Sequence, residues 1–67
     1  MSEGTFYVKE EVDQNSIQEI ESTLNQIDGV ERVLIDTSDG EVIVEFDNEK
    51  VTAEQITKTL EQHQYHV

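Results

Sequence analysis

Cysteine and proline are both absent from this chain of 67 residues. Without cysteine, neither a disulfide nor a thiolate metal ligand can support the core, and without proline no helix or strand is interrupted by a fixed φ. Basic residues are also scarce, because 4 Lys and Arg face 16 Asp and Glu, which gives a formal net charge of -12. Such a surface repels phosphate backbones and anionic lipid headgroups. We therefore expect no nucleic-acid partner and no membrane partner.

Long apolar runs are lacking as well. No segment approaches the roughly 18 residues of a membrane span, and the segment from Met1 to Gly4 lacks the basic and apolar regions of a signal peptide. These features predict a cytoplasmic protein. A hydrophobic content of 34% suffices for one thin core, so we expect a single domain over residues 1–67. High net charge with few aromatics is typical of disorder, but short apolar blocks of regular period favour an ordered fold.

Alternating side chains predict three strands. The first covers Thr5 to Glu11, with Phe6 and Val8 on one face. Two more strands cover residues 32–37 and 41–46, and the Ser38-Asp39-Gly40 segment between them is typical of a hairpin turn. Their inward residues are more uniformly apolar than their outward ones, which indicates a sheet with one buried face.

Spacings of three and four residues predict two helices. Ser16 with Glu19 has the capping-box form at the start of the first helix, and Asp28-Gly29 ends it. Thr52 with Gln55 has the same form at the start of the second. The predicted apolar faces carry Ile17, Ile20, Leu24 and Ile27 in the first helix, and Ala53, Ile56 and Leu60 in the second.

The last residues, Tyr65 to Val67, suffice for a short final strand, so the predicted order is βαββαβ. This order predicts an α+β, ferredoxin-like sandwich, in which a four-stranded antiparallel sheet carries both helices on one face.

The chain resembles the heavy-metal-associated domain, the module of small bacterial copper chaperones and of the amino-terminal repeats of copper-transporting ATPases. The resemblance covers the chain from Thr5 onward. It is carried by Ile27-Asp28-Gly29-Val30, Val33, Ile35, the Asp39-Gly40 turn, Val42, Val44, Phe46-Asp47, Val51, Glu54, Ile56, Leu60-Glu61, Tyr65 and Val67.

Family members that bind metal carry M-x-C-x-x-C between the first strand and the first helix. An ungapped count back from Gly29 places Asp13 and Ser16 at the two cysteine positions. A soft ion such as Cu(I) is held by two thiolates, whereas a carboxylate and a hydroxyl are hard ligands, so we expect neither Cu(I) nor another tightly bound cofactor. The segment from Asp13 to Ser16 is instead typical of a helix cap.

A weak divalent metal site is the alternative. In this fold the loop after the second helix lies beside the loop before the first, which would bring His63 and His66 near Glu10, Glu11 and Asp13. Imidazole with carboxylates suits Zn(II), Cu(II) or Ni(II). Against this site, an H-x-x-H spacing arises easily by chance, and a histidine near a helix C-terminus simply suits the dipole.

The outward strand faces suggest a partner surface. In the sheet order implied by the resemblance, Tyr7, Leu34 and Ile43 would form a row across the open face. Apolar residues on a wet face can mark a docking site, although single exposed apolar residues are ordinary. The face would receive a partner domain or a second copy of the chain, so the protein is expected to be a monomer or a weak homodimer.

Three functions stay open. The first is an interaction or regulatory module that pairs with a metal-transport protein, as the resemblance implies. The second is a metal carrier with a non-thiolate site, and the third is a purely structural domain. Catalysis is not expected, because His63 and His66 are the only candidate bases and lie on a tail too shallow to exclude water.

Overall fold

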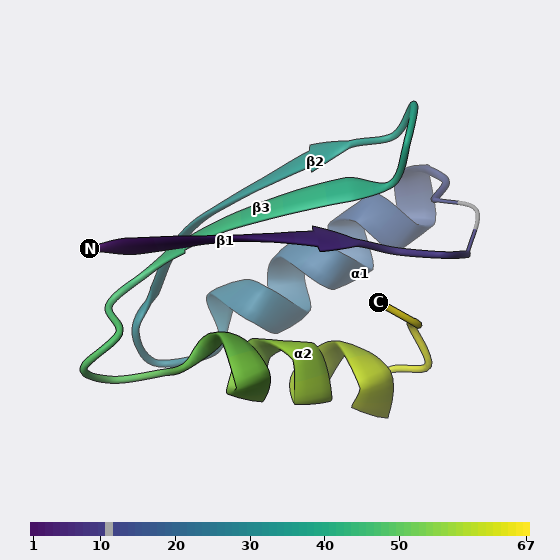
Figure 1. Ribbon diagram of the computed structural model, residues 1–67. Helices are drawn as coiled ribbons and strands as arrows, with labels where there is room; N and C mark the ends of the chain where they lie inside the picture. Colours follow the sequence, from purple (N-terminus) through teal and green to yellow (C-terminus); the bar gives the residue numbers. More distant parts are fainter. Residues whose placement is uncertain (11) are drawn as a thin grey trace.

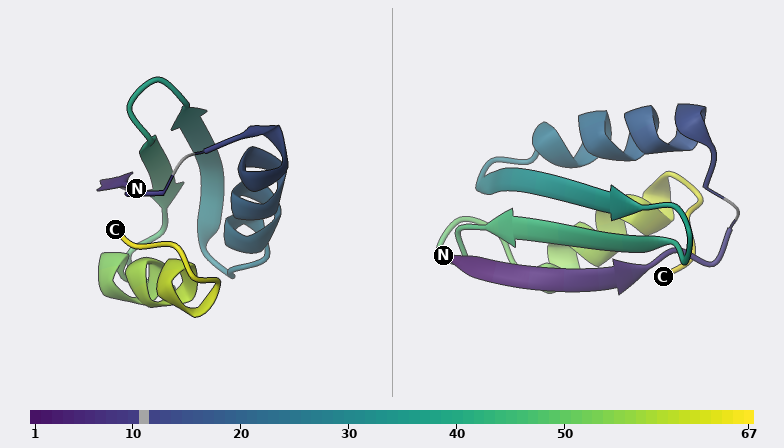
Figure 2. Two further views of the ribbon diagram at one scale, coloured as in Figure 1. Left: turned by 90° about the vertical axis from the view of Figure 1, so that its right-hand side faces the viewer. Right: turned by 90° about the horizontal axis from the view of Figure 1, so that it is seen from above.

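The computed structural model describes residues 1–10 and 12–67 and contains three strands and two helices (Figure 1). In chain order the elements are β1 (Ser2–Tyr7), α1 (Gln14–Asn25), β2 (Val30–Asp36), β3 (Glu41–Phe46) and α2 (Ala53–Gln62). Both helices lie on one face of the sheet, and the other face is open (Figure 2). The predicted ferredoxin-like α+β architecture is confirmed in this respect.

The sheet has the strand order β1-β3-β2, and both pairs are antiparallel. The β1–β3 ladder is regular over six residues, whereas a shift interrupts the β2–β3 ladder between Val30 and Arg32. The hairpin turn ends at Gly40, which has φ +73°. A Cβ there would lie 2.6 Å from the Val8 carbonyl oxygen, so only glycine fits this close approach.

The core lies between the sheet and the helices. It is built from side chains of β3 that alternate inward, from one stripe of each helix, and from the residues that flank β1 and α2. The buried members are Val8, Ile20, Leu24, Val42, Val44, Phe46, Val51, Ile56 and Leu60. Ala53, which the helical spacing assigned to this face, is exposed, because it is the first residue of α2 and precedes the turn that contacts the core.

The fourth strand was predicted wrongly. Residues 65–67 form no strand, and the sheet ends at β1. One backbone hydrogen bond starts the expected pairing, from the Lys9 N–H to the His66 carbonyl oxygen at 2.8 Å. The backbone N–H of Tyr65 instead donates to the Leu60 carbonyl oxygen at 3.0 Å, so this residue closes the end of α2 and does not pair with β1.

The helix ends agree with the sequence in type and differ in position. The Thr52–Gln55 capping box is confirmed, since each residue's side chain accepts the other's backbone N–H, at 3.2 and 2.9 Å. α1 begins one turn earlier than predicted, with Asp13 and not Ser16 as its N-cap. It also ends earlier, at Asn25, while Gly29 has the predicted left-handed conformation, with φ +103°, at the entry to β2.

Candidate functional site

The loop before α1 is organised by the N-cap. Asp13 has an extended backbone, and its Oδ1 accepts the Ser16 N–H at 2.8 Å. That N–H holds the pKa of the Asp13 carboxyl below its usual value. The side chain that faces the positive end of α1 is therefore an anion already engaged by the helix itself.

The C-terminal segment lies against the same end of α1. The Tyr65 hydroxyl donates a hydrogen bond to Glu19 Oε1 at 3.1 Å, in the second turn of α1. Partial burial raises the pKa of the Tyr65 hydroxyl. This contact could not be predicted from the sequence, in which Glu19 fits a solvated helix face.

Glu10 and His66 form the second contact between these segments. The His66 N–H donates to Glu10 Oε1 at 2.7 Å, and the His66 Nδ1 contacts Glu10 Oε2. The hydrogen bond from the His66 backbone N–H contributes most to lowering the pKa of the Glu10 carboxyl. The predicted proximity of Glu10 and His66 is thus present in the structure.

The other members of the hypothetical divalent site do not complete it. His63 is the C-cap of α2, where its backbone N–H bonds the Thr59 and Leu60 carbonyls, and its side chain is exposed. Glu11 lies outside the described residues. Among the residues that the structure does describe, no three histidine or carboxylate side chains are grouped so that they could hold a metal ion.

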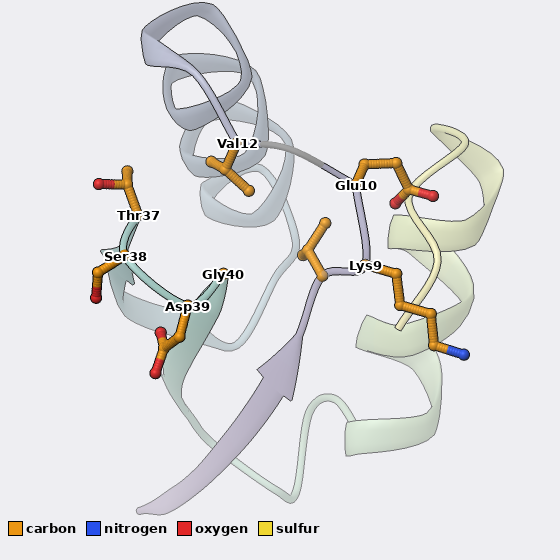
Figure 3. A pocket seen from close by; sticks show the side chains of 8 residues that line it. Lys9, Glu10, Val12, Thr37, Ser38, Asp39 and Gly40 are labelled. Atoms are coloured by element: carbon orange, nitrogen blue, oxygen red, sulfur yellow. The ribbon is translucent and has the colours of Figure 1, made fainter.

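A polar depression separates the hairpin turn from the loop before α1 (Figure 3). Lys9, Glu10 and Val12 line one side and the turn lines the other, and the Lys9 and Glu10 side chains extend away from Ser38 and Asp39. The Ser38 hydroxyl donates to Asp36 Oδ1 at 2.7 Å and thereby lowers the pKa of that carboxyl. Ser38 is accordingly part of the turn, and the carboxylate that accepts its hydrogen bond is a weak base because its pKa is lowered.

The open sheet face consists of three cross-strand rows. The register places Glu3, Glu45 and Arg32 in one row, Thr5, Ile43 and Leu34 in the next, and Tyr7, Glu41 and Asp36 in the third. Leu34 and Ile43 are therefore direct neighbours, but the predicted row does not include Tyr7, which is a diagonal neighbour of Ile43. Instead, the Tyr7 hydroxyl donates to Glu41 Oε2 at 3.1 Å, and this bond raises the pKa of the Tyr7 hydroxyl.

Exposure differs along this face. Tyr7 is 56% and Leu34 43% exposed, whereas Ile43 is half-buried in the middle strand. Elsewhere, neither helix of the described ranges combines the length and apolar character needed to cross a bilayer.

The sequence profile of the heavy-metal-associated domain matches residues 5–66. The chain belongs to this family. Its structure is similar to that of the CopZ metallochaperone, with a TM-score of 0.93 and 30% identity over 98% of each chain. It is also similar to apo-CopP from Helicobacter pylori, with a TM-score of 0.85 and 25% identity over 97% of each chain. No protein with a curated function has a significantly similar sequence.

The fold is shared with more distant domains. A copper binding domain from HMA7, a P-type ATPase, superposes with a TM-score of 0.91 at 20% identity, over 98% of this chain and 89% of that one. Within this heavy-metal-associated domain, however, the residues at the start of α1 do not fit Cu(I). The chain has no cysteine. At the two positions expected for thiolates, the Asp13 carboxylate accepts a hydrogen bond from the Ser16 backbone N–H, and neither side chain is a soft ligand.

Proposed function

We propose that this heavy-metal-associated domain is a non-enzymatic interaction or regulatory module linked to metal transport. The observation that carries the proposal is the Asp13–Ser16 hydrogen bond at 2.8 Å. It uses the helix terminus that favours a thiolate in metal-binding relatives to cap α1. A member with this fold and without soft ligands retains the shape that partners recognise but not the means to carry Cu(I).

The expected partner is a metal-transport protein. Support comes from the relatives, which include a metallochaperone and a domain of a P-type ATPase. We propose that the open sheet face, with Leu34, Ile43 and Tyr7, is the surface that docks. We also propose a cytoplasmic location, which the sequence features described above predict, and fractionation of the source cells tests it.

Affinity capture tests the proposal. The domain is immobilised, and candidate metal-transport proteins are passed over it with and without metals, using the wild type and a Leu34→Ser/Tyr7→Ser variant. The control is Gln18→Ser, because Gln18 is an exposed residue on α1, on the opposite side of the molecule from the open face. We expect capture by the wild type and the control but not by the double variant. Stoichiometric Cu(I) binding by the wild type under reducing conditions would overturn the proposal.

A weak divalent metal carrier is the second candidate, favoured by the contact between Glu10 and His66. Asp13, Ser16, Glu11 and His63 are the other residues placed in this hypothesis. An NMR titration with Zn(II) tests it, with His66→Gln as the variant. If the imidazole signals of both histidines stay in place at excess Zn(II), the carrier hypothesis is wrong.

A further inference from the structure

β1 forms one edge of the sheet and has a partner on one side only. Proteins usually protect such edges, since unpaired backbone groups can pair with another chain. The opposite edge, on β2, has a bulge between Val30 and Arg32, which is one of the usual protections. The β1–β3 register runs from Ser2 to Tyr7 without a shift, so the edge of β1 is straight and regular.

The direction of the backbone groups along β1 follows from two hydrogen bonds. The Val8 N–H donates to the Gly40 carbonyl at 2.9 Å, toward β3, and the Lys9 N–H donates to the His66 carbonyl at 2.8 Å, away from it. Successive residues of a strand point these groups to opposite sides. The outward set therefore comprises Glu3, Thr5 and Tyr7. Over residues 1–10 and 12–67, no backbone hydrogen bond reaches this set from outside the sheet.

A mainly apolar groove runs beside this edge, between β1 and α2. Phe6, Thr57 and Val67 are among its lining residues, which span 5–9 on the strand side. The groove lies on the side of the sheet that faces α2, so the inward side chains of a strand added to β1 would enter it. The C-terminus, whose Val67 also lines the groove, lies beside the C-terminal end of β1 (Figures 1 and 2), and among the described residues the edge along Glu3 and Thr5 has no backbone partner.

The charge around the edge selects the kind of strand. Glu3 lies directly opposite Glu45 on the open face, and like charges in such a pair repel. Arg32 meets Glu45 at 4.0 Å, but in the described part of the chain no ion pair includes Glu3. A basic side chain opposite Glu3 would offset this repulsion. A second copy of the domain would instead bring another -12 of charge to the edge.

From these observations we propose that the free edge of β1 binds an extended, basic segment of a partner protein as the fourth strand. The backbone groups of Glu3, Thr5 and Tyr7 bond the segment, alternate apolar side chains enter the groove, and a basic side chain faces Glu3. The inference rests on the proposed interaction role and assigns it a surface beyond the open face.

The test uses a synthetic peptide, Lys-Val-Thr-Val-Lys-Val with blocked ends, and the isotopically labelled full chain. We expect its addition to shift the amide signals of Glu3, Thr5 and Tyr7 and to slow their hydrogen exchange by about tenfold or more. A peptide with Glu in place of both Lys residues should leave the signals unchanged. Equal binding of the two peptides would overturn the proposal.

Two variants separate the edge from general charge effects. Glu3→Lys should weaken binding of the basic peptide by about tenfold, while Glu31→Lys, with the same change in net charge on exposed β2, should leave it unchanged. Thr5→Pro removes one outward N–H and should abolish binding with the fold preserved in the circular dichroism spectrum. Shifts confined to Leu34 and Ile43, or edge shifts that depend on protein concentration without peptide, would refute the assignment of the edge. Partner capture through the open face would still support the proposed function in that case, whereas edge binding with no captured transport protein would count against that function alone.

Discussion

The Asp13 carboxylate accepts the Ser16 N–H at 2.8 Å, across the two positions where metal-binding family members carry thiolates. The chain has no cysteine, so these positions lack the two soft ligands that Cu(I) prefers, and the residues there cap the helix instead. The contact stabilises the N-terminus of α1, because the Asp13 carboxylate places a negative charge at the positive end of the helix dipole.

Loss of the cap should destabilise the domain. We expect Asp13→Ala to lower the free energy of unfolding by about 1 kcal/mol, because the first turn of α1 loses its side-chain acceptor. Asp13→Asn keeps an acceptor oxygen and should cost much less. Urea denaturation followed by circular dichroism measures both, and equal losses in the two variants would show that the charge matters and the cap does not.

Thiolates at the two cap positions should restore soft-metal binding. The variant Asp13→Cys/Ser16→Cys places a C-x-x-C pair at the start of α1, where the helix dipole favours the thiolate form. We expect one Cu(I) per chain in competition with a chromogenic chelator under reducing conditions. Ser16→Cys alone is the control and should lose the competition. A double variant that also loses would mean that the surrounding loop, and not the missing sulfur, prevents binding.

Glu10 should make stability depend on pH in the acid range. The folded state lowers the pKa of Glu10 from its ordinary value of 4.5, mainly through the His66 N–H. Its contribution to stability is therefore complete above that value and is lost as the pH falls through the lower pKa of the folded state. Glu10→Gln should flatten the pH profile below 4.5, the ordinary value, relative to Glu61→Gln, which removes the same charge from an exposed position on α2. Parallel profiles for the two variants in urea denaturation would contradict this.

Added salt should stabilise the domain. The Debye length is about 30 Å at 0.01 M salt and about 8 Å at 0.15 M. The molecule measures 31 × 20 × 17 Å, so its carboxylates repel one another across the whole structure at the lower salt concentration only. We expect the urea midpoint to rise between these two conditions, and to rise less in a Glu21→Gln/Glu61→Gln variant. A midpoint independent of salt would refute the argument.

Sequence patterns predicted both helices and the β2–β3 hairpin well, because those patterns repeat several times, whereas the first strand was expected at Thr5 to Glu11 and lies at Ser2–Tyr7. The helix stripe that includes Ile20 and Leu24, and the alternation through Val42 and Val44, each repeat enough to identify the buried face. The order of elements then limited the topology to very few choices. The capping box at Thr52 was also readable, because both of its partners are local in sequence.

Contacts between distant segments were beyond the sequence alone. Alternation assigns Tyr7 to the outward face, but only the register shows that it faces Glu41 and not Ile43. The start of α1 was ambiguous because Asp13 and Ser16 are both good caps. The family resemblance, which implies a final strand, could not show that Tyr65 bonds α1 instead of extending the sheet.

The Tyr65–Glu19 hydrogen bond joins residues 46 positions apart. Glu19 lies in α1, and Tyr65 follows α2, the last helix in the chain. Contacts of such long sequence separation carry a large loop-closure cost and are expected late in folding, whereas the β2–β3 hairpin can form locally. The protein carries its own reporter for this step, since it has no tryptophan and only two tyrosines. In a Tyr7→Phe variant, stopped-flow tyrosine fluorescence would follow the docking of the last residues onto α1 as the final event of folding.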